Sequence, residues 1–578
     1  MFTYSLRTAI YIAVFLSLVG ILIFLKNVSG RIKSYTLLRD ILGWQQAALV
    51  LMFAAYLGIL WQVMIWDSKG LPFSVLVGWG DGAYHLDIIS RLANSKPFSI
   101  SQPIAAGQPL TYPFMIDFLS AIFKAIGLND AWSWHIPPFV LGIGLFFLVY
   151  SFGKKVLGSR SWAVAFLFLI FFGAGLGFLW FFQDIKSAWD SNGVSGVIEA
   201  LWNPPHEYTH LDNRTGGKPK EFDAPLNIVW MVPAVSFFSH QRSFIAGAGI
   251  SILFLLGLWI YRNDQKIMPI WLMLLGLLPL LHTHSFVSLT IITLSIFFLT
   301  LLEERKLSTL ISWAIGGIFA LIFALPQVLF LSQAGFLGKE AGGSFFKPWF
   351  GWMTCTHSNS WFFCDRGVPG TDVNPFWFWT KNFGVIFLFW ILALIYFKNK
   401  KGPRDLKVFV LPSIIMFLVP NLILLQPWEF DNNKALFYWW LFAALFALTF
   451  LKDGLRNDYT KAAIIFLFLV ASGLSGTVDV FARIKNGILT TLSPGKTPYH
   501  FTYYGDDEIE IAKWIKENTN PNDAFLTVDW ANQSIPMLTG RPIYLGFPGW
   551  LWTQGRGELV AERQRKIQNF VFSGNPQE

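Results

Sequence analysis

The chain has 578 residues, of which 54% are hydrophobic, 17% aromatic and only 14% charged, and its mean hydropathy is +0.48. Apolar segments of about 20 residues recur along most of the length, which excludes a soluble globular protein and indicates an all-α polytopic membrane protein. The net charge of +9 does not require a nucleic acid partner, because the basic residues gather in short loops between apolar segments, as the positive-inside rule describes.

Segments apolar enough to cross a membrane predict about 12 or 13 transmembrane helices. They cover residues 8–25, 43–66, 135–152, 161–182, 243–261, 268–283, 285–302, 308–333, 382–398, 407–425, 435–451 and 462–480. The basic loops all lie in the cytoplasm if the N-terminus is outside and residues 112–128 form an interfacial helix rather than a crossing. Asp117 and Lys124 within that short segment favour the interfacial helix.

This orientation divides the chain into a transmembrane domain, residues 1–480, and an extracytoplasmic tail, residues 481–578. The long outer loops are expected at residues 67–134, 183–241 and 334–381. Most of the polar and unusual side chains of the chain therefore converge on the outer face.

The tail has the composition of a small α/β segment rather than of further membrane spans. Helices are expected at 508–518 and 558–571, and strands at 524–528 and 542–545. The abrupt ending at residues 575–578 suggests an incomplete tail. Cys355 and Cys364, the two cysteines, share one outer loop and are either a disulfide or two thiols.

The first outer loop contains Asp81 between Gly80 and Gly82, where small neighbours allow a bulky ligand to approach closely. A short amphipathic helix is predicted to follow, from Tyr84 to Leu92. Asp81 is the strongest candidate for a reactive group. The competing interpretation is a solvated acid that caps this helix. Within the helix, Asp87 and His85 are second choices that would orient the base, and Tyr84 would line the pocket.

The string His206-Glu-Tyr-Thr-His210 matches the H-E-x-x-H pattern of zinc peptidases. That chemistry needs a helix that presents both histidines on one face, together with a third ligand. Pro204 and Pro205 precede the string and a Gly-rich segment follows it, so a helix has little room to form. We therefore expect His206 and His210 to line an acceptor pocket, and we predict no metal.

Three further groups of polar residues are expected at the outer ends of spans. His282 and His284 end an apolar run beside Ser285 and suggest a pocket floor. Ionisable residues at such depth are expensive and tend to mark function. They include Glu429, Asp431 and Lys434, which open one span, and Arg242, which opens another. Arg242 and Lys434 are the candidates for holding an anionic phosphate.

Together these features resemble the GT-C superfamily of membrane-embedded glycosyltransferases. The resemblance rests on Asp81-Gly-Ala-Tyr-His85 before an amphipathic helix, on Pro109-Leu-Thr-Tyr-Pro-Phe114 leading into an apolar stretch, and on the tail segment 540–549. It implies a donor sugar linked to polyprenyl phosphate and a catalytic acid at the position of Asp81. The second acidic motif of the metal-dependent oligosaccharyl transferases has no equivalent here, so the resemblance favours a metal-independent enzyme without a cofactor, with a divalent metal as the alternative.

The expected function is transfer of a hexose or pentose from a polyprenyl-phosphate lipid to a glycan, lipid or protein acceptor outside the plasma membrane. A lipid phosphate leaves readily, so one carboxylate, Asp81, suffices as general base. Nearby cations stabilise the phosphate as it departs. A lipid or polysaccharide transporter or flippase is the alternative, although charged residues in mid-span and internal repeats are scarce. A zinc peptidase and an inactive scaffold are further alternatives.

Overall fold

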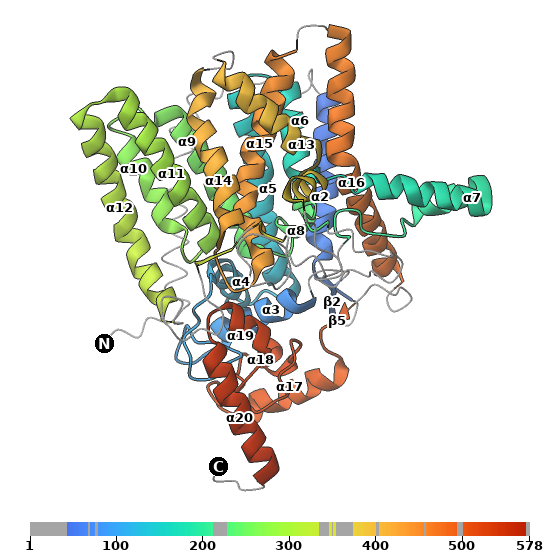
Figure 1. Ribbon diagram of the computed structural model, residues 1–578. Helices are drawn as coiled ribbons and strands as arrows, with labels where there is room; N and C mark the ends of the chain where they lie inside the picture. Colours follow the sequence, from blue (N-terminus) through green and yellow to red (C-terminus); the bar gives the residue numbers. More distant parts are fainter. Residues whose placement is uncertain are drawn as a thin grey trace, which may run out of the picture.

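The computed structural model describes residues 43–67, 70–74, 79–211, 228–333, 346–349, 351–353, 374–399, 404–455, 458–493 and 501–573. The span predicted at 8–25, the two cysteines and the end of the tail lie outside these residues. Within them the chain forms a bundle of long helices with a smaller helical layer at one end (Figure 1).

Eight helices in the described residues have the length and apolar composition to cross a membrane. Three shorter apolar helices lie among them. The long ones are α2 (Trp44–Gln62), α5 (Asp130–Leu157), α9 (Arg242–Tyr261), α11 (Thr283–Glu304), α12 (Leu307–Ser332), α13 (Pro375–Lys398), α15 (Asn433–Asp453) and α16 (Asp458–Leu492). The shorter ones are α6 (Arg160–Phe172), α10 (Met268–Leu272) with η1 (Met273–Leu277), and η2 (Arg404–Phe409) with α14 (Val410–Leu422). A helix thus occupies every predicted span that falls within the described residues, and the protein is a multi-pass helical membrane protein.

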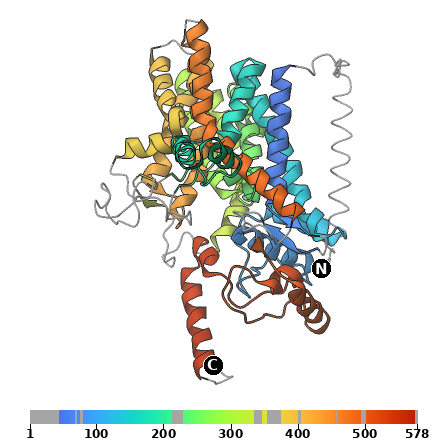
Figure 2. The same ribbon diagram turned by 90° about the vertical axis from the view of Figure 1, so that its right-hand side faces the viewer.

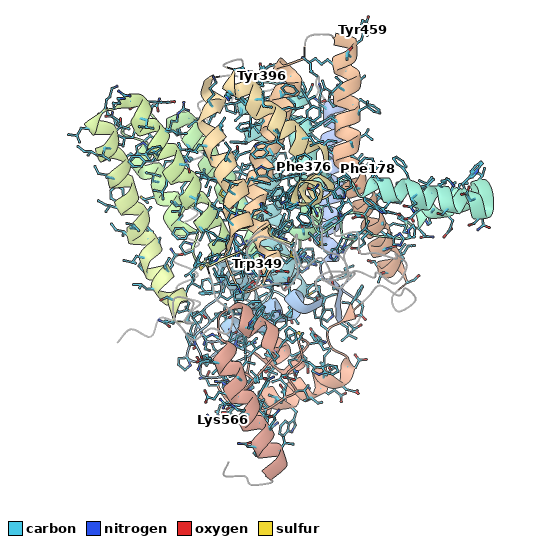
Figure 3. All side chains as sticks on the ribbon, in the orientation of Figure 1. Phe178, Trp349, Phe376, Tyr396, Tyr459 and Lys566 are labelled. Atoms are coloured by element: carbon cyan, nitrogen blue, oxygen red, sulfur yellow. The ribbon has the colours of Figure 1, made fainter. Side chains whose placement is uncertain are left out.

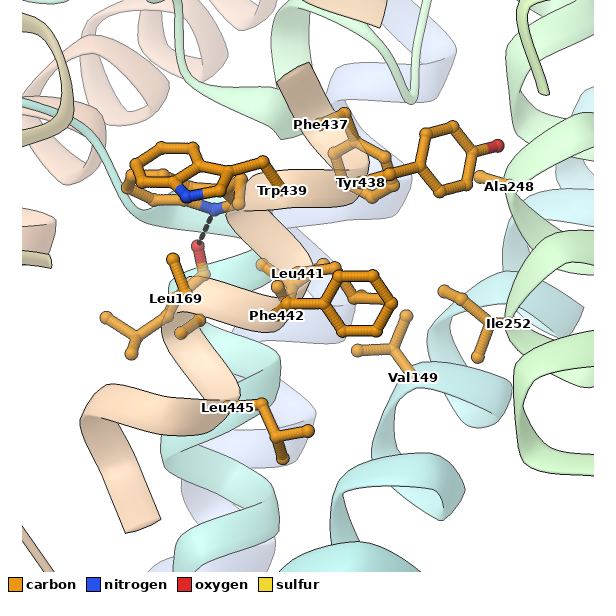
Figure 4. Close-up of a cluster of buried hydrophobic side chains, with 14 of the residues drawn as sticks. Val149, Leu169, Ala248, Ile252, Phe437, Tyr438, Trp439, Leu441, Phe442 and Leu445 are labelled. Carbon is orange, nitrogen blue, oxygen red and sulfur yellow. Dashed lines mark hydrogen bonds between the residues drawn. The ribbon is translucent and has the colours of Figure 1, made fainter. Parts of the chain in front are cut away.

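Helix α15 is the centre of the bundle. Almost all its side chains are buried, because α15 is apolar on every side and its neighbours surround it. Figure 4 shows its aromatic residues packed against α5, α6 and α9, and the indole Nε1–H of Trp440 donates to the carbonyl oxygen of Leu169 at 3.1 Å. That bond satisfies the single polar atom which burial of this ring would otherwise leave unpaired.

The two ends of the bundle differ in composition. The turn between α5 and α6, the start of α12 and the start of α16 carry basic residues and lie at one end. The first outer segment and the tail lie at the opposite end. Figure 3 labels Tyr459 at the first end and Lys566, on the last helix of the tail, far beyond the second. We refer to these as the basic end and the outer end.

The prediction of one span over 161–182 was wrong. Helix α6 ends at Phe172, and a second helix, α7 (Phe178–Trp202), leaves the bundle sideways (Figures 1 and 2). Two glycines make the change of direction possible, because other chain segments touch their Cα atoms. A Cβ on Gly175 would lie 2.0 Å from the carbonyl oxygen of Lys381, and one on Gly177 would lie 1.7 Å from that of Tyr208.

The outer layer is built from both ends of the described chain. Helices α3 (Trp79–Asn94) and α4 (Met115–Ala125) pack against the tail around their own hydrophobic core. Helix α4 confirms a helix within the segment 112–128. A small antiparallel sheet has the order β1 (Ile65–Trp66), β2 (Pro72–Ser74), β5 (Phe501–Thr502), with Ile65 opposite Phe73 and Phe73 opposite Thr502. A second pair joins β3 (Lys347–Pro348) to β4 (Ile423–Leu424).

The tail begins later than predicted, because α16 continues without a break past residue 480 to Leu492. The two expected helices form as α17 (Asp506–Asn518) and α20 (Gly557–Ser573). Two short helices, α18 (Ser534–Thr539) and α19 (Pro548–Thr553), lie between them. The two expected strands are reduced to one parallel bridge between Phe525 and Ile543. The described tail is therefore mostly helical rather than α/β.

Candidate functional site

Asp81 lies half-buried in the first turn of α3, at the outer end of the bundle. The helix begins at Trp79, five residues earlier than predicted, so Asp81 belongs to the helix rather than to a loop before it. The negative charge suits this place, since the N-terminal turn of a helix favours anions. One Asp81 oxygen, Oδ2, accepts a hydrogen bond from Gln241 Nε2 at 3.3 Å.

Among the described residues, Tyr112, His240, Asp431 and Tyr503 lie within electrostatic reach of Asp81. Burial raises the pKa of Tyr112 well above its usual value, and the charge of Asp81 raises it further. Burial lowers the pKa of His240, whereas Asp81 acts in the opposite direction. The raised pKa of Tyr112 and the lowered pKa of His240 both favour the neutral side chain. Asp81 is therefore flanked by a phenol, an imidazole and an amide, all able to donate hydrogen bonds.

Two cations approach the same histidine from other helices. Lys434 at the start of α15 and Arg483 near the outer end of α16 both lower the pKa of His240. Lys434 Nζ is 3.0 Å from Asp431 Oδ1, with each side chain 13% exposed. Arg483 Nη2 is 2.8 Å from Glu207 Oε2. We call Asp81, Tyr112, His240, Gln241, Asp431, Lys434 and Arg483 the outer polar site.

The other predicted residues near Lys434 have different roles. His282 caps α11: its Nδ1 accepts the backbone N–H of Ser285 at 3.1 Å, and the side chain is buried. Its ring lies 5.6 Å from that of His284, which remains half-buried within electrostatic reach of Lys434. Glu429 is half-buried in η3 (Glu429–Asn432), the turn that carries Asp431. His284 and Glu429 therefore border the outer polar site, whereas His282 holds a helix end.

The placement of Arg242 corrects its predicted role. Its guanidinium is 1% exposed and bound on all sides: Nε donates to Asp117 Oδ1 at 3.0 Å, Nη1 to the carbonyl oxygen of Trp134 at 3.1 Å, and Nη2 to Ser120 Oγ at 2.5 Å. It also stacks on the ring of Trp134 at 4.1 Å. An arginine held in this way joins α9 to α4 and α5, and its burial keeps it away from a lipid phosphate.

Two more residues of α3 prove to be structural. His85 Nδ1 is 2.7 Å from Asp117 Oδ2, so His85 and Arg242 share one buried carboxylate. Tyr84 donates from its hydroxyl to Gln102 Oε1 at 3.0 Å, accepts from Gln554 Nε2 at 2.9 Å, and stacks on Trp550. Both side chains are buried, so they fasten α3 to its neighbours and do not line an open pocket.

Asp87 is also buried on α3, and neither of its oxygens has a hydrogen-bond partner among the described residues. Burial raises the pKa of this carboxyl well above its usual value, which favours the neutral acid. Asp87 is thus unsuited to orienting a base in the outer polar site.

The H-E-x-x-H string does not form a helix. Residues 203–210 run as turns, His206 Nδ1 lies 2.8 Å from Asp184 Oδ2, and Glu207 pairs with Arg483. His210 follows in the last of these turns, half-buried. Within the described residues no group of three His, Cys, Asp or Glu side chains could hold a metal ion. The string therefore lacks the geometry of a zinc peptidase.

Sequence reasoning did not select Tyr112, His240, Gln241 or Arg483. Two of these directly precede Arg242, in the string Ser239-His-Gln-Arg242, from which only the arginine was chosen. The sequence showed that Arg242 stands at the start of a helix, but it did not show in which direction each neighbouring side chain points. Arg483 was assigned to the tail, and only the continuous helix α16 brings it to the site.

Comparison with known protein families finds no match to this chain, and comparison with characterised proteins finds no match in sequence. Among solved structures, the chain is similar to the Archaeoglobus fulgidus oligosaccharyltransferase tethered with an acceptor peptide containing the NVT sequon. The identity is 14% and the TM-score 0.43, over 91% of this chain and 68% of that one. The same enzyme in complex with Zn and sulfate gives 12% and 0.45, over 86% and 62%.

A third similar structure is ArnT from Cupriavidus metallidurans bound to undecaprenyl phosphate. The identity is 11% and the TM-score 0.45, over 91% of each chain. Similarity at this level does not assign the chain to a family or an activity. The function is therefore argued from the outer polar site.

Proposed function

We propose that this protein is a glycosyltransferase of the GT-C type, which moves a sugar from a polyprenyl-phosphate lipid to an acceptor on the extracytoplasmic side of the plasma membrane. The observation that carries the proposal is the grouping of Asp81 with Lys434 and Arg483 around His240, at the outer ends of membrane helices. A carboxylate beside two cations suits a reaction in which a hydroxyl loses a proton while a phosphate accumulates charge.

The height of the cations in the bundle suits a lipid phosphate. Arg483 lies roughly 37 Å along α16 from Asp458 at the usual rise per residue, whereas the hydrocarbon core of a bilayer is about 30 Å thick. This length supports a position of its guanidinium near the lipid headgroups of the outer leaflet. Its Nε–H has no partner among the described residues, and a phosphate oxygen would accept a hydrogen bond from it.

In this mechanism Asp81 accepts the proton of the acceptor hydroxyl as that oxygen attacks the anomeric carbon. The glycosidic bond to phosphate breaks, and Lys434 and Arg483 neutralise the departing lipid phosphate. Gln241 holds Asp81 Oδ2, which leaves Oδ1 to face the acceptor. The phosphate leaves without a proton, so a second carboxylate as general acid is not required.

The test is turnover by the purified chain of a panel of polyprenyl-phosphate hexoses and pentoses, with lipid phosphate release as the readout. Asp81→Asn should abolish release while the protein still retains the sugar lipid. Asp507→Asn, at an exposed site on α17, is the matched control and should keep full activity. Normal turnover by Asp81→Asn would refute the role of Asp81. Neither release nor lipid retention by the wild type would instead favour the transporter.

A further inference from the structure

Helix α7 is a hairpin of two helical arms. Gly193, with φ 56° and ψ −139°, reverses the chain direction between them. The arms pack closely through small residues: a Cβ on Gly196 would lie 2.2 Å from the carbonyl oxygen of Ala188, and Ala200 is buried on the same side of the second arm. Small residues four apart permit this close approach of two backbones.

The hairpin exposes large apolar side chains along both arms. On the first arm these are Leu179, Phe182 and Trp189; on the second they are Val194, Ile198, Leu201 and Trp202, and each is between 46% and 63% exposed. Gln183, Ser187 and Ser191 follow another side of the first arm. Lys186 lies at helical spacing between Leu179 and Phe182, and it forms an ion pair with Asp190. The first arm thus has an apolar side and a polar side, and Lys186 and Asp190 add charged ends to the apolar side that can reach the headgroups.

Contacts with α16 give the height at which the hairpin leaves the bundle. The backbone N–H of Phe178 donates to Ser475 Oγ at 2.8 Å, and Lys485 Nζ donates to the carbonyl oxygen of Trp202 at 2.7 Å. Ser475 and Lys485 lie roughly 26 and 40 Å along α16 from Asp458. Because α16 begins beyond the basic ends of the neighbouring helices (Figure 1), this interval lies in the outer half of the bilayer and reaches its boundary with the headgroups, since the hydrocarbon core is about 30 Å thick.

We propose that the α7 hairpin is a membrane-binding arm, which lies in the interface of the outer leaflet with its apolar face among the phospholipid chains. Figure 1 shows it projecting sideways from the bundle, and Figure 2 shows it end-on, so its long direction runs across the membrane helices. An apolar surface of this size beside water is unfavourable. Two exposed tryptophans suit the interface, where amphipathic rings concentrate.

The other possible positions fit less well. Deeper insertion would bury in hydrocarbon both the polar side of the first arm and the ion pair of Lys186 with Asp190. Packing against a second protein would leave unexplained why the arm emerges at the headgroup level of α16. In the lipid interface the apolar side of the hairpin contacts lipid chains while the polar side contacts headgroups and water.

The arm is held rigidly where it joins the bundle. Asp184 Oδ2 contacts His206 Nδ1 at 2.8 Å and accepts from the Tyr208 hydroxyl at 2.5 Å. The carboxylate of Asp479 on α16 accepts the backbone N–H groups of Tyr208 and Thr209, each at 2.8 Å. These bonds fix the angle of the hairpin, so its direction does not depend on lipid contact.

The test places nitroxide labels on single cysteines in a protein with Cys355 and Cys364 replaced by serine. Phe182→Cys and Ile198→Cys report on the apolar face, and Ser187→Cys and Ser191→Cys are matched controls on the polar face. The labelled protein is reconstituted in vesicles of phosphatidylethanolamine and phosphatidylglycerol. Collision rates with oxygen, which enters lipid, and with a water-soluble nickel chelate are then measured by electron paramagnetic resonance.

We expect labels at 182 and 198 to collide more with oxygen and less with nickel than labels at 187 and 191. Nickel access at 182 and 198 equal to that at 187 would place the arm in water and overturn the proposal. Protection of 182 and 198 from both reagents would show that protein covers this face and would overturn it equally. Two apolar positions on different arms are used, so that the result does not depend on a single label that disturbs the fold.

Discussion

The hydroxyl oxygen of Tyr503 occupies the place of a side chain at Gly82: a Cβ there would lie only 2.1 Å from it. Tyr503 belongs to the tail and Gly82 follows Asp81 in α3, so the tail rests directly on the helical turn that carries the proposed base. Burial, then the charge of Asp81, raises the pKa of Tyr503. The absence of a side chain at Gly82 is therefore a requirement of tail packing.

Gly82→Ala should weaken the contact between the tail and α3. Alanine favours a helix more than glycine does, by about 1 kcal/mol, but overpacking in a buried site costs about 1–3 kcal/mol. We expect a lower melting temperature in detergent and faster proteolytic cleavage of the tail. Gly144→Ala on α5 is the control, because its Cβ would meet no atom within 4 Å. Equal behaviour of the two variants would contradict the contact.

Arg242 and Lys434 should respond differently to replacement by methionine. Arg242→Met leaves the buried Asp117 without its guanidinium partner, and loss of one member of a buried pair costs about 3–5 kcal/mol. Lys434→Met removes the partner of Asp431, in a pair less buried than that of Arg242, so it should lower the melting temperature less than Arg242→Met and raise the KM for the lipid donor. Thermal unfolding and donor titration separate the two effects. A stable Arg242→Met protein with impaired donor binding would restore the phosphate role to Arg242.

Asp87 should make stability depend on pH. Burial raises its pKa in the folded state, so the folded protein favours the neutral acid. The stabilising contribution is complete below the ordinary value of 3.8 and is lost as the pH rises through the raised folded value. Asp87→Asn, neutral at every pH, should therefore unfold at a higher temperature than the wild type near neutral pH. Asp507→Asn should follow the wild type, and identical melting curves for Asp87→Asn would contradict the argument.

Chelation should leave turnover intact. In the proposed mechanism Lys434 and Arg483 supply the positive charge at the phosphate, and no group of three metal ligands occurs in the described residues. Sugar transfer is measured after treatment with EDTA and again after addition of Mg²⁺ or Mn²⁺. Loss of activity with recovery on adding metal would instead assign Asp81 to a metal site.

The sequence was sufficient to predict the helical membrane fold and that its polar residues gather at one end of the bundle. Apolar segments of spanning length must form helices in lipid, because each backbone N–H and C=O needs a partner within its own segment. Local pattern therefore predicted the eight described helices that are long and apolar enough to cross a membrane, whereas the spans predicted at 161–182, 268–283 and 407–425 correspond to shorter helices. In the first of these segments the glycines at 175 and 177 meet Lys381 and Tyr208, which are distant in the sequence.

The tertiary structure alone decided which polar residues belong together. Arg242 and Lys434 both open membrane helices, yet one is enclosed by α4 and α5 and the other borders Asp81. Arg483 comes from a helix predicted to end before it. Hydrophobic periodicity determines where a helix forms and that it crosses the bilayer. Its rotation and height, which bring a side chain into a site or bury it, depend on packing against helices far away in the chain.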